Sequence, residues 1–134
     1  MKGTVALLVA LGFAGAASGA EKAPAKADAA AGQAIVTKVC AACHGAEGEG
    51  GGPVAAVMQT TVPNLRTLAK RNGGTFPTDA VTAYIDGRQV KAAHGDRQMP
   101  VWGDVFRGPE QGGAERTVRE RINALVGYLK GIQY

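Results

Sequence analysis

Residues 40–44 read CAACH, with two cysteines three positions apart and a histidine directly after the second one. In a helical turn, residues at i and i+3 lie on the same face, so both sulfur atoms can reach one partner. The chain has only these two cysteines and only one other histidine, His94. Chance would rarely place so few residues in this order, so the stretch indicates a single shared site.

The C-x-x-C-H spacing is typical of the covalent attachment of a c-type haem. Cys40 and Cys43 would form thioether bonds to the porphyrin, and His44 would become the proximal ligand of the iron. A thioredoxin-like redox pair would need strands, a zinc site would need the distant His94, and a disulfide would leave a small core unfilled. The sequence therefore predicts one covalent haem c.

The first 20 residues are typical of a secretory signal peptide. Lys2 precedes an apolar run over 5–13, and the small residues Ser18-Gly19-Ala20 precede a charged residue. We predict cleavage near Ala20 and a periplasmic location, with a retained membrane anchor as the alternative. The run is shorter than the roughly 20 residues that cross a bilayer, so no transmembrane segment is expected in the mature chain.

The remaining chain is short enough for one domain. Residues 21–31 are rich in alanine and lysine without apolar periodicity, so they are predicted to form a flexible linker, and 32–134 to form the domain. The net charge of +4 comes with interspersed acids and no basic stripe, so nucleic acid is not an expected partner. Only 5% of residues are aromatic, which fits a core filled by a large cofactor or a loosely packed alanine-rich bundle.

Apolar periodicity predicts an all-α domain of three to five helices joined by long loops. A first helix is expected over 32–44, with short helical segments at 54–58 and 65–71. Another helix should be capped by Thr78 and Asp79, and residues 88–113 are predicted to be irregular.

The last helix has the clearest pattern. Its apolar residues recur at i, i+4, i+7, i+8 and i+11, and they are Val118, Ile122, Leu125, Val126 and Leu129.

A second iron ligand is expected in KAAHGDRQMPVWG, residues 91–103. A thioether ligand raises the reduction potential of a haem. Local chemistry favours Met99 over His94, because Pro100 stiffens the loop that would hold the weak iron–sulfur bond. Histidine also binds ferric iron readily, so His94 stays an alternative, whereas Met58 is more easily explained as a core residue.

The order of CAACHG, a glycine-rich loop ending in GP, then PNL, MPVWG and a last helix with YL resembles the class I c-type cytochromes. These are small monohaem electron carriers, and the resemblance covers residues 32–134. It implies the cytochrome c fold around one covalent haem held by Cys40 and Cys43. It also implies that His44 is the proximal ligand and Met99 the distal ligand.

The resemblance further implies that Gly32 in the first helix packs against Tyr128 in the last. In this family a proline carbonyl accepts the ring N–H of the proximal histidine. Both Pro53 and Pro63 have suitable positions here, and Pro53 is preferred because it ends the GGGP turn.

Trp102 and Arg97 are candidate haem neighbours that would hydrogen-bond the propionates. Their other interpretations are a core tryptophan and a solvated arginine.

These features predict a one-electron carrier and not an enzyme, either a free monomeric shuttle or a subunit of a redox complex. Its partners would be a dehydrogenase, an oxidase or a reductase. Lys38, Arg88, Lys91 and Arg97 are candidates for a positive ring that steers acidic partners, although each one taken singly is better explained as an ordinary solubility charge. The competing prediction is a peroxidase or gas sensor, whose iron would need an open sixth position.

Overall fold

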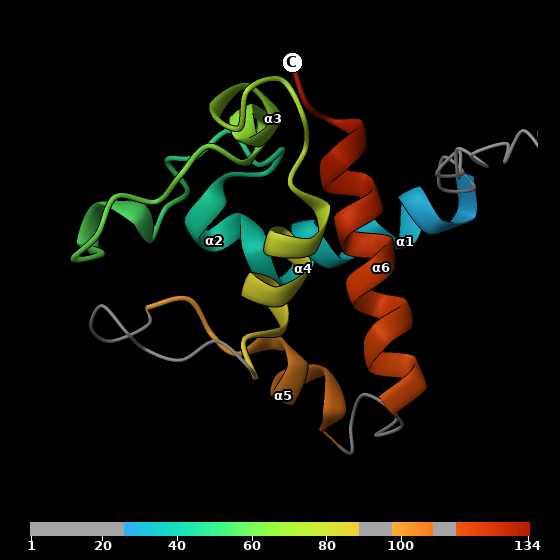
Figure 1. The fold of residues 1–134 in the computed structure, drawn as a ribbon. Coiled ribbons are helices and arrows are strands. Elements are labelled where there is room, and N and C mark those ends of the chain that lie inside the picture. Colours follow the sequence, from blue (N-terminus) through green and yellow to red (C-terminus); the bar gives the residue numbers. More distant parts are fainter. Residues whose placement is uncertain (1–25, 89–97, 109–114) are drawn as a thin grey trace, which may run out of the picture.

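The computed structural model describes residues 26–88, 98–108 and 115–134 (Figure 1). Within these ranges all regular secondary structure is helical, which confirms the predicted all-α class. The predicted signal peptide over 1–20 lies outside the described residues, as do Lys91, His94 and Arg97.

The first helical segment is longer than predicted. Helix α1 (Lys26–Ile35) continues through a π-helical turn, η1 (Val36–Cys40), into α2 (Ala41–His44). The prediction of a flexible linker was therefore wrong for residues 26–31. Alanine has the highest intrinsic helix propensity, and α1 packs against α6 (Glu115–Gly131). The segment ends at Gly45, whose φ of 83° is readily adopted only by glycine.

The middle of the chain contains short helices, as predicted, and they are η2 (Ala55–Val57), η3 (Leu65–Thr67), α3 (Leu68–Arg71) and α4 (Thr78–Asp86). The side chain of Asn64 caps η3 by accepting the backbone N–H of Arg66 at 2.8 Å. The predicted caps of α4 were wrong, because Thr78 and Asp79 are its first helical residues. Pro77 occupies the cap position, and no side chain caps this end of the helix.

Helix α5 (Trp102–Arg107) lies in the stretch that was predicted to be irregular. It has six residues, which is too few to show a helical period in the sequence. The last helix, α6, confirms its prediction, since all five residues of the expected apolar face are buried.

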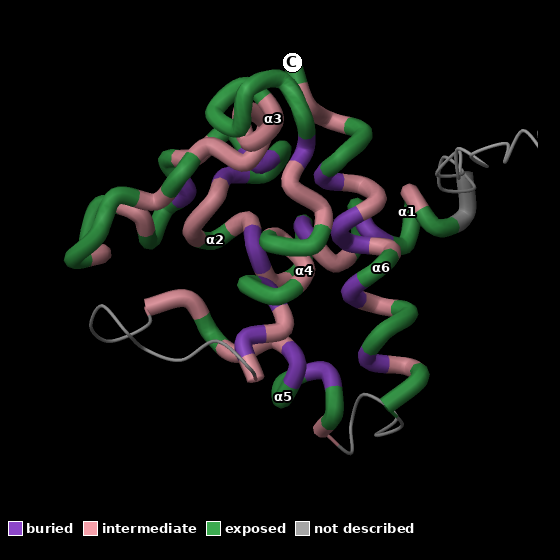
Figure 2. The backbone as a smooth tube through the Cα atoms, viewed as in Figure 1, coloured by how far each residue is buried: buried purple, intermediate pink, exposed green. Residues whose placement is uncertain are grey.

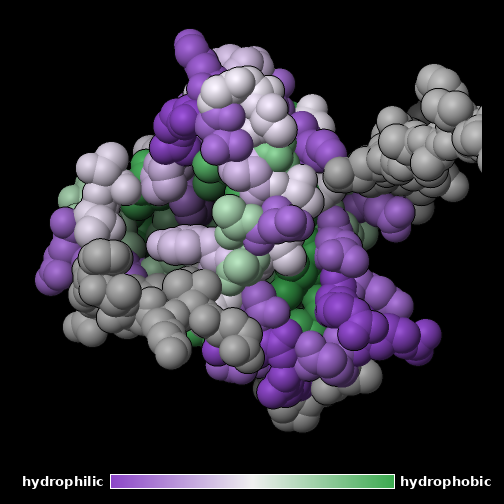
Figure 3. Space-filling model, viewed as in Figure 1, coloured by the Kyte–Doolittle hydropathy of each residue, from purple (hydrophilic) through white to green (hydrophobic). Residues whose placement is uncertain are grey.

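The core lies where α6 meets the other helices. Helix α6 packs against α1, α4 and α5 (Figure 1), and its buried face meets a set of residues from the rest of the chain (Figure 2). This set comprises Val36, Cys40, Phe76, Ile85 and Phe106. The solvent-facing side of α6 is mostly polar in the space-filling view (Figure 3).

Gly32 and Tyr128 lie in contact, as the family resemblance implied. A Cβ atom built on Gly32 would lie 2.7 Å from the Cβ of Tyr128 and would also meet the backbone of Ala124. Only glycine therefore allows α1 to approach α6 this closely.

Candidate cofactor site

A cavity of about 510 Å³ lies between α2, α4, α6 and the segments around residues 58–65 and 98–102. This volume is within the range of about 300–1,000 Å³ that is usual for small-molecule sites. Most of its lining is apolar, and the lining includes Val39, Met58, Val62, Leu65, Leu68, Val81, Ile85, Met99, Trp102, Leu125 and Leu129. A large, flat and largely apolar group would suit such a wall.

Cys40 and Cys43 both line this cavity as free thiols. Burial, together with a smaller effect of the neighbouring Cys43, raises the pKa of the Cys40 thiol to about 11. The reactive thiol of a redox dithiol acts as a thiolate, whereas this thiol stays protonated at neutral pH. Within the described part of the chain, no three His, Cys, Asp or Glu side chains are grouped to hold a metal ion. The pair therefore fits covalent attachment better than either alternative.

His44 lines the cavity beside the cysteines, and its ring is held by Pro63. The ring Nδ1 lies 3.0 Å from the carbonyl oxygen of Pro63. Because a carbonyl can only accept a hydrogen bond, Nδ1 carries the proton and Nε2 keeps its lone pair for a metal.

The preference for Pro53 was wrong, because Pro53 is exposed and does not line the cavity. The backbone explains this difference. Val54 donates to the carbonyl of Ala42 at 2.8 Å, which folds the glycine-rich loop back along α2. The chain then returns toward the cavity and places Pro63 beside the histidine ring.

Met99 and Met58 also line the cavity, and both are partly buried. Residues next to the two methionines are hydrogen-bonded to each other. Thr60 donates to Oε1 of Gln98 at 3.1 Å, and Nε2 of Gln98 donates to Oε1 of Gln59 at 3.3 Å. These bonds join the segment that carries Met99 to the loop that carries Met58.

Trp102, one of the two predicted haem neighbours, lines the cavity and stacks on Phe106 with ring centroids 5.8 Å apart. The structure thus brings Cys40, Cys43, His44, Met99 and Trp102 to one cavity. The other predicted haem neighbour, Arg97, lies outside the described residues.

Arg71 is a cavity residue that the sequence reasoning missed. Among the described residues that line the cavity, it is the only one from the set of lysine, arginine, aspartate and glutamate. Its Nη2 donates to the backbone carbonyl of Asn64 at 2.9 Å. An arginine at the edge of an apolar cavity suits a ligand that carries carboxylates. The sequence alone does not separate it from Lys70, since basic residues are common in the last turn of any helix.

Arg88 was a candidate for a positive ring, but its charge is taken up by ion pairs. Its guanidinium forms ion pairs with Asp86 and Glu115, and its side chain is only 16% exposed. Lys38, another candidate for the ring, is exposed.

The residues at the cavity fit a covalent haem, with two thiols, one imidazole of fixed tautomer, two thioethers and one described cation in a largely apolar lining. A family model described as cytochrome c matches residues 29–133. Searches of curated proteins and of solved structures return no match. None of the helices in the described ranges is long and apolar enough to cross a membrane.

Proposed function

Because the chain belongs to the cytochrome c family, we propose that it carries single electrons between redox proteins, with His44 and Met99 as axial ligands. The family binds haem c covalently, and Cys40 and Cys43 have the matching spacing. When bound, the haem supplies an iron that alternates between the ferric and ferrous states. The observation that supports this proposal best is that both cysteines, His44 and Met99 line the same cavity.

The protein's own contribution is to hold the ligands in place and to keep water away. The hydrogen bond to Pro63 holds the His44 ring in one orientation and raises its basicity as a ligand. Apolar side chains such as Leu68, Ile85 and Leu125 surround the site. A site that is dry and preorganised changes little in structure when the charge changes, which suits fast electron transfer.

Arg71 would pair with a haem propionate, because it is the only lysine, arginine, aspartate or glutamate among the described residues that line the cavity. Replacing Arg71 with glutamine removes a positive charge near the iron, so the ferric state is stabilised and the reduction potential falls. Redox titration of the holoprotein measures this change. Lys70→Gln is the matched control, because Lys70 is exposed and does not line the cavity. Equal potentials for both variants would contradict the role of Arg71.

The axial ligands are tested by replacing each candidate with alanine. A ferric iron with a thioether ligand has a weak far-red sulfur-to-iron absorption band. We expect Met99→Ala to abolish this band, and Met58→Ala and His94→Ala to retain it. If Met58→Ala abolishes the band and Met99→Ala retains it, the sulfur ligand is Met58. Loss of the low-spin state only in His94→Ala would overturn thioether ligation altogether.

The same proposal places the protein in the periplasm after removal of residues 1–20, with a dehydrogenase, oxidase or reductase as its partner. In this role it is an electron carrier and not an enzyme. Size-exclusion chromatography of a native periplasmic extract distinguishes its two forms. A free shuttle elutes as a small haem protein, whereas a subunit elutes together with a large enzyme.

A further inference from the structure

The start of α5, which closely follows Met99 in the sequence, lies in contact with Arg88. Arg88 is two residues beyond the end of α4, and Gly103 is the second residue of α5. A Cβ atom built on Gly103 would lie 2.9 Å from Cδ of Arg88 and would also meet the Arg88 guanidinium and the Asp86 carboxylate. Gly103 therefore lets the start of α5 approach Arg88 closely.

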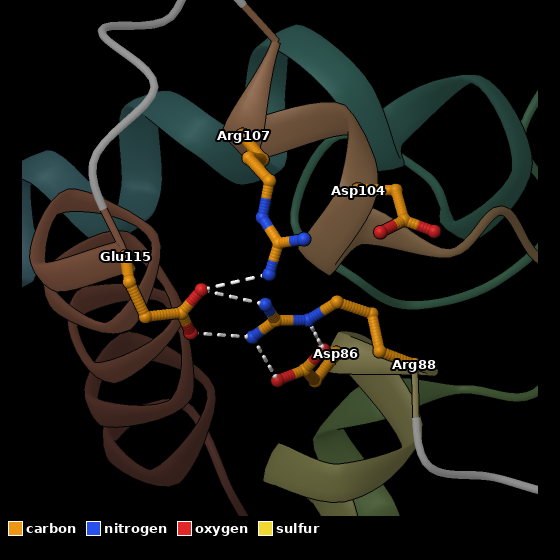
Figure 4. A pocket seen from close by; sticks show the side chains of 5 residues that line it. All are labelled: Asp86, Arg88, Asp104, Arg107 and Glu115. Carbon is orange, nitrogen blue, oxygen red and sulfur yellow. Dashed lines mark hydrogen bonds and ion pairs between the residues drawn. The ribbon is translucent and has the colours of Figure 1, made fainter.

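Arg88 joins the start of α5 to α4 and α6 (Figure 4). Its guanidinium donates to both carboxylate oxygens of Asp86 at the end of α4. It also donates to both oxygens of Glu115, the first residue of α6, at 2.8 and 2.9 Å. Arg107 in α5 donates to Glu115 at 2.8 Å. Such charge-assisted, bidentate pairs fix geometry more strongly than neutral hydrogen bonds.

We propose that Arg88, held by Asp86 and Glu115, is a positioning residue that keeps Met99 on the haem iron. The inference rests on the proposed function, because it needs Met99 to be the distal ligand. Arg88 does not line the cavity, so it acts through its contact with Gly103 at the start of α5, four residues after Met99.

The physical basis is the effective concentration of a tethered ligand. The iron–thioether bond is weak, so Met99 competes with external ligands according to how often its tether places it at the iron. Without the contacts of Arg88, the start of α5 is held less firmly against α4 and α6, so Met99, four residues before Gly103, is placed at the iron less often. An external ligand then displaces Met99 more easily, although nothing at the iron itself has changed.

Imidazole binding to the ferric holoprotein measures this competition. We expect Arg88→Gln to tighten imidazole binding about tenfold, which corresponds to about 1.4 kcal/mol. Arg88→Lys should give an intermediate value, because lysine keeps the charge but lacks the bidentate fork. Arg116→Gln is the matched control, since it removes an exposed arginine of α6 that lies 4.0 Å from the carboxylate of Glu120. It should bind imidazole as the wild type does.

Gly103→Ala perturbs the contact between α5 and Arg88 without removing a charge. It is the variant to use if Arg88→Gln does not fold. Its new methyl group would push against Arg88 and Asp86, so imidazole binding should again tighten. Gly131→Ala is its control, because a Cβ atom at Gly131 would meet nothing within 4 Å.

A Met99→Ala background separates positioning from general loosening of the fold. There the competing thioether is absent, so Arg88→Gln should leave the imidazole affinity unchanged. The inference is overturned if Arg88→Gln has no effect when Met99 is present, or if its tenfold effect persists without Met99. If Met99→Ala alone leaves the far-red band intact, the proposed ligation itself is wrong and the inference falls with it.

Discussion

Replacing Gly32 with alanine tests how closely the first and last helices pack. A Cβ atom at this position would lie 2.7 Å from Cβ of Tyr128 and 2.8 Å from the carbonyl carbon of Ala124. These obstacles are backbone atoms and a Cβ atom, which no rotamer change can move aside. Helix α1 must therefore shift away from α6.

The expected loss of stability combines two opposing effects. Overpacking a tight contact costs about 1–3 kcal/mol, and the upper value applies here because the Cβ meets two residues at once. Alanine in place of glycine inside a helix stabilises it by about 1 kcal/mol. The net loss is then about 2 kcal/mol, which lowers the melting temperature of a domain of this size by roughly 8–16 °C.

Chemical and thermal unfolding of the holoprotein, followed by far-UV circular dichroism, measures this loss. Gly131→Ala is the control, because it lies in the last turn of α6 with open space around the new methyl group. It should be neutral or stabilising by up to about 1 kcal/mol. If Gly32→Ala is as stable as Gly131→Ala, the close contact between α1 and α6 is wrong.

Two further predictions concern stability. Leu125 is 1% exposed, so Leu125→Ala should lower the free energy of unfolding by about 2–5 kcal/mol in denaturant titrations, and a loss below about 1 kcal/mol would contradict its burial. Arg88 and Arg107 lower the pKa of Glu115 from 4.5 to about 2. Because the folded pKa is the lower one, this stabilisation is present above pH 4.5 and is lost as the pH falls toward 2. Arg107→Gln should therefore show a shallower fall of stability in this pH range, and an unchanged pH profile would show that its ion pair with Glu115 contributes nothing.

The parts of the fold that were predictable carry strong local signals. The apolar face of α6 repeats over three turns, so Val118 to Leu129 could be assigned to the core directly. CAACH predicted the cofactor, because the spacing of Cys40, Cys43 and His44 follows from the chemistry of attachment. Glycines limited the first helix for a similarly local reason, since Gly45 adopts a positive φ.

Other features depend on contacts between distant parts of the chain. Residues 26–31 lack apolar periodicity, but their alanines favour a helix, and they extend the same helix whose Gly32 packs against α6. The choice between Pro53 and Pro63 depends on how the glycine-rich loop folds back on α2. The cavity position of Arg71 and the ion pairs of Arg88 likewise arise only when segments far apart in sequence meet.

The most direct test of the central claim, a closed haem site with His44 and Met99 on the iron, is the optical spectrum of the purified holoprotein. We expect a low-spin ferric spectrum with the far-red sulfur-to-iron band, and a ferrous spectrum that does not change when carbon monoxide is added. A high-spin ferric spectrum, or immediate binding of carbon monoxide, would show an open sixth position and would contradict the proposed role as an electron carrier.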